Sequence, residues 1–276
     1  MPVQHQLQPA DDISDKDVIG SWDQAADEFA GFFSEGDEFY HKHIITPCLM
    51  DLLGDLEGKM VLDLGCGEGH LARYLAEGTR STKVLGLDAS ENMIRIAAEK
   101  SQDFADRLAF QQADASDLAG IPSGFFDVAV CNMALMDIKN YSQAIKEVSR
   151  TLKAQGVFVF SILHPCFHTP GSGWVKDQDD AIVGWQVGSY YSGLAWKWTP
   201  KSRMSKEAYC FHRTLQDYAT ALRGAGFVIT DIREPIPSAE LLEKHPRLDR
   251  ELIRGDFLVV KCVLLSVVSC SAITCL

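Results

Sequence analysis

The chain has 276 residues, of which 46% are hydrophobic and 23% are charged, and its formal net charge is −12. This length is enough to bury a substantial core, and the ordinary composition excludes a fibrous or low-complexity protein. The acidic charge repels phosphate backbones, so a nucleic-acid partner is disfavoured.

Eight cysteines are scattered along the chain, without a CxxC pair or a zinc-ligand spacing, and the N-terminus lacks the pattern of a secretory signal. We therefore expect reduced thiols in a cytoplasmic protein, and no metal site. The apolar residues 262–276 are short for a membrane span. We expect them to form the end of a last strand and an apolar tail over 266–276, rather than a membrane anchor.

The first expected elements are helices, because apolar side chains recur at helical spacing between residues 21 and 53. Strands and helices then alternate. The sequence predicts strands over 59–65, 83–88, 108–114, 125–133 and 156–163, and helices over 70–77, 91–100 and 141–152. Ser90 is the expected N-cap of the second of these helices. Such alternation is typical of βαβ units, which build a parallel sheet with helices on both faces.

The alternation stops between residues 164 and 212, which hold four of the five tryptophans and several tyrosines. A stretch of this length without helical periodicity is usually functional or disordered, and so many aromatic side chains argue against disorder. The pattern returns with a helix over 215–223, a strand over 227–235, a short helix over 239–244 and a last strand over 256–265.

Three glycines follow the first of the alternating strands, in the sequence VLDLGCGEGHLARYLA of residues 61–76. Asp63, Gly65, Gly67 and Gly69 lie where that strand ends and a helix begins, and glycines there permit positive φ and a close approach of the backbone to a ligand. In an open parallel sheet, ligands bind beyond the carboxyl ends of the strands.

The spacing of this turn separates two kinds of cofactor. A dinucleotide loop would have its third glycine where His70 stands, and Glu68 would place a carboxylate beside the phosphates. An acidic turn instead suits a phosphate-free cofactor with a cationic head, such as S-adenosylmethionine (SAM), which carries a sulfonium and an ammonium group.

Three further strand ends support this interpretation. Asp88 ends the second strand, where its carboxylate can accept from both hydroxyls of a ribose. Asp114 ends the third, where it can accept from an adenine amino group while the amide of Ala115 or Ser116 meets a ring nitrogen. Taken singly, both aspartates can equally be caps. The residues that follow the fourth strand would place carbonyl groups and soft apolar surface near the sulfonium, or belong to the core: Asn132, Met133 and Met136.

The ordered set resembles the class I SAM-dependent methyltransferases of the small-molecule type. VLDLGCGEGHLARYLA is similar to the family's first motif, GLDASENMI to its second, QQADASDL to its third and FFDVAVCNMALMDI to its fourth. The resemblance implies an α/β three-layer sandwich around a seven-stranded, mostly parallel sheet with the last strand antiparallel, a helical lid and an aromatic-rich cap insertion. The implied parts are the lid over 1–55, the SAM-binding core over 56–163, the cap over 164–212, the rest of the core over 213–265 and the tail over 266–276.

The resemblance also implies the residues that bind the cofactor. Gly65 and Gly67 would line its methionine moiety, Asp88 would bind the ribose, and Asp114 and Ala115 would meet the adenine. The full predicted set is Asp63, Gly65, Gly67, Gly69, Asp88, Ala89, Met93, Asp114, Ala115, Asn132, Met133 and Met136.

The predicted function is transfer of the SAM methyl group to an oxygen or nitrogen atom of a small-molecule acceptor, which leaves S-adenosylhomocysteine (SAH). The alternative is a SAM-binding regulatory or partner subunit without turnover, and a homodimer is kept beside a monomer. A base matters only when the acceptor must lose a proton, and the candidate is His164, which can equally be a structural histidine. The side chains predicted to contact the acceptor, or else to serve as packing, are Trp22, Tyr40, His164, Tyr190 and Tyr191.

Overall fold

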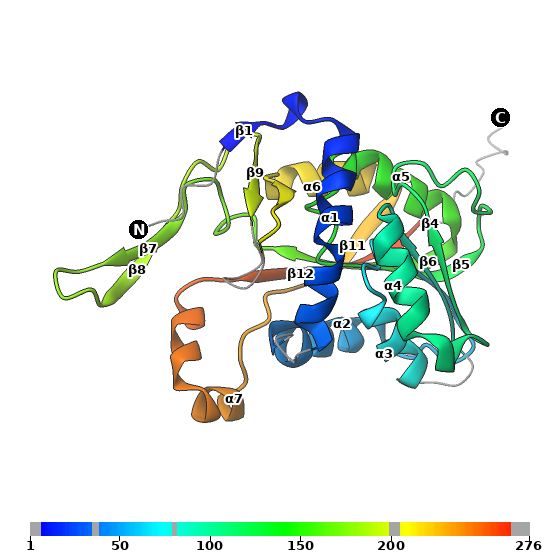
Figure 1. The fold of residues 1–276 in the computed structure, drawn as a ribbon, viewed down its shortest axis with the longest axis horizontal. Helices are drawn as coiled ribbons and strands as arrows, with labels where there is room; N and C mark the ends of the chain where they lie inside the picture. The colour runs from blue at the N-terminus through cyan, green and yellow to red at the C-terminus, as the bar shows by residue number, and fades with distance from the viewer. Residues whose placement is uncertain (1–6, 35–38, 79–81, 199–204, 266–276) are drawn as a thin grey trace, which may run out of the picture.

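The computed structural model describes residues 7–34, 39–78, 82–198 and 205–265, so the expected tail over 266–276 lies outside the described residues. Its centre is a seven-stranded sheet in the order β11-β12-β6-β5-β2-β3-β4 (Figure 1). These strands are β2 (Met60–Leu64), β3 (Lys83–Asp88), β4 (Leu108–Gln112), β5 (Phe126–Asn132), β6 (Leu152–Leu163), β11 (Phe227–Arg233) and β12 (Phe257–Leu264).

The strands of this sheet run mostly in one direction. Each pair between neighbours in the row β6-β5-β2-β3-β4 is parallel, whereas β12 pairs antiparallel with both β6 and β11. The predicted mostly parallel sheet with an antiparallel last strand is therefore confirmed. β6 begins earlier than predicted, because the chain leaves the preceding helix directly into the strand. Gln155, at φ 63, lies in the irregular part of its pairing with β5.

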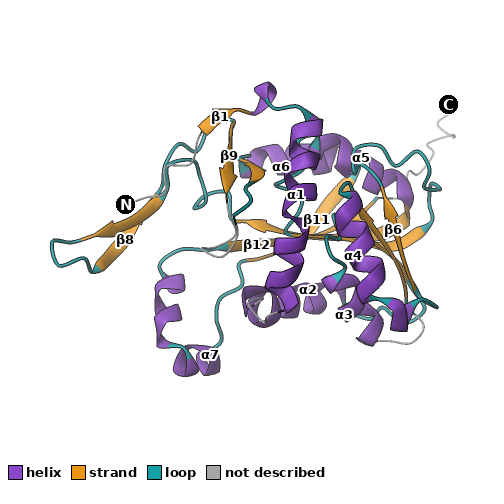
Figure 2. Ribbon diagram, in the orientation of Figure 1, coloured by secondary structure: helices purple, strands orange, loops and turns teal. Residues whose placement is uncertain are grey.

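Helices cover both faces of the sheet (Figure 2). Alternate residues of a strand point to opposite faces, and β2 shows the result. Val61 packs in a core cluster with α2 (Thr46–Leu53) and α3 (His70–Gly78). Leu62 packs in the other cluster, with α5 (Tyr141–Thr151) and α6 (Leu215–Gly224). The remaining helices are α4 (Glu91–Lys100), α7 (Ala239–Lys244), a π-helix at His41–Ile45 and 3-10 turns at Ala10–Asp12, Gln102–Phe104 and Pro246–Leu252.

The first long helix, α1 (Asp15–Ser34), lies across the edge of the sheet where β2 to β6 end. Ala26 and Ala30 of α1 pack against Met93 and Ile96 of α4. Asp23 of α1 also accepts hydrogen bonds at the start of α4, from Ser90 Oγ at 2.7 Å, Asn92 N at 2.9 Å and Asn92 Nδ2 at 3.0 Å. Ser90 is the N-cap of α4, as predicted, since its Oγ accepts from Met93 N at 3.1 Å.

The aromatic segment 164–212 forms strands that were not predicted. β7 (Gly173–Lys176) and β8 (Ile182–Gln186) make a protruding hairpin, and β9 (Leu194–Trp198) pairs with β10 (Ala208–Phe211) and with β1 (Leu7–Pro9). Val18 of α1 packs against this small β1-β9-β10 sheet in a separate apolar cluster. α1 therefore joins the β1-β9-β10 sheet to α4 of the core.

Two further properties concern the whole described part of the chain. No helix in it combines the length and the apolar character needed to cross a membrane. Its six cysteines are all free thiols.

Candidate functional site

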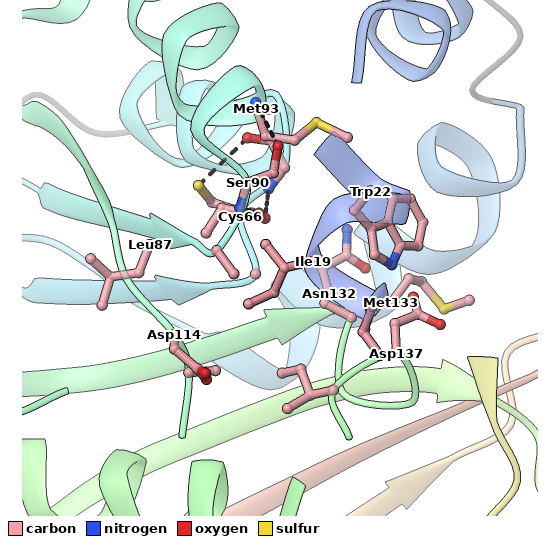
Figure 3. Close-up of a pocket in the computed structure, with 18 of the residues that line it drawn as sticks. Ile19, Trp22, Cys66, Leu87, Ser90, Met93, Asp114, Asn132, Met133 and Asp137 are labelled. Carbon is pink, nitrogen blue, oxygen red and sulfur yellow. Dashed lines mark hydrogen bonds between the residues drawn. The ribbon is translucent and has the colours of Figure 1, made fainter. Parts of the chain in front are cut away.

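A cavity of about 210 Å³ lies between α1 and the carboxyl ends of the parallel strands (Figure 3). The structure brings together at its wall eleven of the twelve residues predicted to bind the cofactor: Asp63, Gly65, Gly67, Asp88, Ala89, Met93, Asp114, Ala115, Asn132, Met133 and Met136. Gly69, just before α3, is not part of the wall. A Cβ at this position would face Ala97 and Phe110. Assigning these residues to a cofactor stays a prediction.

The glycine turn is shaped by contacts that exclude side chains. Gly65 has φ +68, and a Cβ there would lie 2.5 Å from Ala134 Cβ, well inside contact distance. Gly65 N and Cys66 N both donate to Leu87 O, at 2.7 and 2.9 Å, which ties the turn to the end of β3. The backbone of this turn is therefore exposed to the cavity at a place where no larger residue fits.

Asp88 joins the turn to the next strand end. Its Oδ2 accepts from Gly67 N and its Oδ1 from Ser90 N, both at 2.9 Å. Burial raises the pKa of this carboxyl above its ordinary value, although these bonds oppose the shift. Each carboxylate oxygen has a second lone pair. Asp88 can therefore hold the turn and still accept from a ligand in the cavity.

Asp63 is almost completely buried, with 1% of its surface exposed. Its Oδ2 has no hydrogen-bond partner among the described residues. Burial, and secondly the charge of Asp88, raise the pKa of Asp63 to about 7. A buried carboxylate oxygen without a partner is costly, so this position fits a ligand that brings a cation. By contrast, Glu68 is neutralised by Arg73 and Lys100, each at 2.7 Å.

The raised pKa of Asp63 predicts a pH-dependent cost. The folded state holds the Asp63 proton more tightly than the unfolded state, so stability falls as the pH rises from 3.8 to about 7. As the pH rises from 5 to 8, we expect the free energy of unfolding of Asp63→Asn to increase by about 2 kcal/mol relative to that of the wild type. Urea unfolding of both proteins, without ligand, at the two pH values measures this gain.

The matched control is Asp127→Asn, at the opposite edge of the sheet. Burial of Asp127 is outweighed by hydrogen bonds from Lys153 and Met60 N, so its pKa is lowered. The Asp127 carboxyl is then ionised in both the folded and the unfolded protein, at pH 5 and at pH 8. The control should show the same stability difference from wild type at both values. An equally constant difference for Asp63→Asn would contradict the assigned pKa.

The end of β5 completes the wall at an unusual backbone position, which β6 supports from behind. Met133 has φ 54, a conformation that side-chain residues rarely adopt and that is common at functional sites. Its N–H donates to Ser161 O and Ser161 Oγ, both at 3.0 Å, and Ser161 Oγ donates to Asn132 Oδ1 at 2.7 Å. On β4, Asp114 Oδ1 accepts from Ser116 N and Oγ, at 2.8 Å each.

Two histidines that sequence reasoning did not assign to this site also line the cavity. His41 lies on the π-helix, and its Nδ1 is 3.4 Å from Asn132 Nδ2. His70 begins α3, and the centroid of its ring lies 6.3 Å from that of His41. A π-turn is not readable from residue periodicity, although such turns are frequent at functional sites. Asp137 and Trp198 were missed as well.

Of the five residues proposed to contact the acceptor, Trp22 lines the cavity and the other four do not. His164 is 4% exposed, its Nε2 is 2.8 Å from Glu234 Oε1, and its Nδ1 accepts from Cys166 N at 3.1 Å. Both ring nitrogens are therefore engaged, Nδ1 by Cys166 of the loop after β6 and Nε2 by Glu234, which directly follows β11. Its role as a base stays a prediction that this geometry does not favour.

The three tyrosines also point elsewhere. Tyr40 Oη donates to Glu251 Oε1 at 3.0 Å, and burial raises the pKa of Tyr40 to about 12. Tyr190 Oη accepts from Leu215 N at 3.1 Å. Tyr191 is 89% exposed. Their contact with an acceptor stays a prediction as well.

Comparisons with known proteins agree on the kind of domain. A family described as "Methyltransferase domain" matches residues 55–183. A crystal structure of a putative S-adenosylmethionine-dependent methyltransferase from Listeria monocytogenes superposes with a TM-score of 0.68 and 30% identity, covering 78% of this chain and 94% of that one. An uncharacterized protein of Haemophilus influenzae is 30% identical over 199 residues, or 70% of this chain and 76% of that protein.

A third relative has a named activity. The ubiquinone biosynthesis O-methyltransferase of Alkalilimnicola ehrlichii is 31% identical over 126 residues, which are 44% of this chain. The match spans half the length of that enzyme.

Proposed function

Since the chain belongs to the S-adenosylmethionine-dependent methyltransferases, we propose that it transfers a methyl group to an oxygen or nitrogen atom of a small-molecule acceptor. The observation that supports this most directly is the cavity, where the ends of β2, β3, β4 and β5 meet beside a buried carboxylate oxygen of Asp63 that has no partner among the described residues. The cavity wall fits the cofactor, because it offers a turn that admits backbone alone and an acid that lacks a cation.

Each part of SAM has a partner of suitable chemistry in this wall. Asp63 would hold the ammonium group, the glycine turn would pack against the methionine chain, and Asp88 would accept from the ribose hydroxyls. Asp114 would accept from the adenine amino group. When bound, SAM supplies a methyl group activated by a sulfonium. The chain then has to hold the acceptor in line and keep water out, and fixed geometry alone supplies effective molarities of about 10⁵–10⁸ M in well-oriented systems.

The charge of the cavity limits the acceptor. Asp63 and Asp88 make the wall acidic, so an anionic acceptor is disfavoured. An oxygen acceptor on a small molecule is supported by the Alkalilimnicola relative, which its name describes as an O-methyltransferase of ubiquinone biosynthesis. Free thiols support a cytoplasmic location.

Transfer of a tritiated methyl group from SAM into a metabolite extract, with mass identification of the labelled product, tests the proposal. We expect a labelled small molecule, formed more slowly at subsaturating SAM when Asp88→Ala replaces the wild type. Calorimetry with SAM and with a nicotinamide dinucleotide runs in parallel. Tight SAM binding without any labelled product would favour a regulatory or partner subunit. Dinucleotide binding without SAM binding would refute the proposal that this chain transfers a methyl group from SAM.

A further inference from the structure

One end of the cavity is built from segments outside the glycine turn. α1 contributes Ile19 and Trp22, the loop between β5 and α5 contributes Asp137, and β9 of the cap contributes Trp198. In Figure 3, Trp22 and Asp137 lie on the side of the view opposite Leu87 and Asp114. This end is therefore separate from the positions predicted to hold ribose and adenine, and the cap reaches it.

Two polar atoms at this end lack a partner among the described residues. Asp137 is 6% exposed, and its Oδ1 is buried without a hydrogen bond to any residue that the structure describes. Within the same described ranges, Trp198 Nε1 is also buried and without an acceptor. An indole N–H is a donor alone, whereas a carboxyl oxygen accepts or, when protonated, donates. Buried polar groups normally find partners, so a ligand that satisfies both would gain two hydrogen bonds.

The loop that carries Asp137 is held rigidly from the cap side. Arg213 Nη1 donates to Leu135 O and Met136 O, each at 3.3 Å, while Nη2 donates to Ile138 O at 2.5 Å and Lys139 O at 2.9 Å. Phe211 N on β10 adds a bond to Met136 O at 2.9 Å. The Asp137 carboxyl, which also has a hydrogen bond with the Cys210 side chain, is therefore preorganised, and among the described residues its Oδ1 alone lacks a partner.

The charges nearby favour an uncharged ligand. Lys139 Nζ already donates to Ile13 O, and Arg213 already donates to several carbonyl groups, so both cations are held by neutral acceptors. Burial raises the pKa of Asp137 well above its ordinary value, against the effects of Cys210 and Arg213. An ammonium group only donates hydrogen bonds, so it would leave Trp198 Nε1 without an acceptor. A hydroxyl group can both donate and accept, as the two unpaired atoms require.

We propose that Asp137 and Trp198 bind the acceptor and select an uncharged molecule with a hydroxyl group, whose apolar body packs beside Trp22. The inference rests on the proposed function, because the same cavity must hold the cofactor. Asp137 Oδ1 and Trp198 Nε1 are then the polar contacts of the acceptor hydroxyl.

Phenol, toluene and benzylamine are suitable probes because they differ in one group on the same ring. Saturation-transfer NMR titrations on the full chain, at saturating SAH, give their dissociation constants. We expect the wild type to bind phenol at least about threefold more tightly than toluene or benzylamine. In Asp137→Leu and in Trp198→Phe, the preference for phenol over toluene should fall below about twofold. Each variant tests the pair by itself if the other fails to fold.

Trp185→Phe is the matched control, because Trp185 Nε1 donates to Phe167 O at 3.0 Å and the residue does not line the cavity. It should keep the phenol preference. Calorimetry of SAH with every variant separates the two proposals. A wild type that does not bind SAH refutes the proposed function. Normal SAH binding refutes this inference alone if phenol shows no preference, if both variants retain it, or if benzylamine binds best. A fivefold or greater loss of SAH affinity in both Asp137→Leu and Trp198→Phe would assign these two residues to the cofactor, and would also refute their role in acceptor binding.

Discussion

Replacing Asp88 with alanine is expected to raise the dissociation constant of SAM at least about tenfold, since two ribose hydroxyls lose a charged acceptor. The structure adds a second cause. Asp88 Oδ2 accepts from Gly67 N at 2.9 Å, so the variant also releases one side of the glycine turn. Calorimetric titration of the wild type and the variant with SAM measures the change.

Asp88→Asn separates the two causes. The amide oxygen can still accept from Gly67 N or from a hydroxyl, but it carries no charge, so a smaller loss than for alanine is expected. Asp127→Ala, at the other edge of the sheet, is the control for removal of an aspartate and should bind SAM as the wild type does. An unchanged constant for Asp88→Ala would remove Asp88 from the cofactor site.

Gly65→Ala is expected to destabilise the protein by roughly 2–5 kcal/mol, because a positive-φ backbone costs about 1–2 kcal/mol and an overpacked contact about 1–3 kcal/mol. The new Cβ would lie 2.5 Å from Ala134 Cβ, so the turn or the β5–α5 loop must move. Both segments line the cavity, and SAM affinity should fall by at least about tenfold. Urea unfolding and calorimetry measure the two effects.

Gly58→Ala is the matched control for the backbone term. Gly58 has φ +69, almost the same as Gly65, but a Cβ there meets nothing within 4 Å. Its cost should be limited to about 1–2 kcal/mol for the conformation, with SAM binding unchanged. Equal losses of stability in the two variants would show that contact with Ala134 does not shape the turn.

The parallel core could be predicted from the sequence because each strand is followed by a clear helical period, and Ser90 marks a helix start by its own chemistry. The strand-end acids of the cavity follow from the same reasoning, since carboxyl ends of parallel strands share one edge. The cap strands could not be predicted, because β9 and β10 are short and are paired by tertiary contacts rather than by a turn signal.

The acceptor end of the cavity was missed for a different reason. Asp137 points into it because Arg213, 77 positions along the chain from Met136 and 75 from Ile138, fixes the backbone of its loop. Trp198 reaches the cavity through the small sheet with β1 and β10. His164 was favoured from its place after β6, but its ring is engaged by Glu234, and strand order does not reveal which way a loop side chain turns.

The double packing of α1 has a consequence for how small molecules reach the interior. The same helix rests on α4 through Asp23 and on the cap sheet through Val18, so it cannot swing outward without disturbing both. Lid and cap are therefore expected to open as one body. Cofactor and acceptor would then share a single gate, and the departure of each product would depend on the same movement.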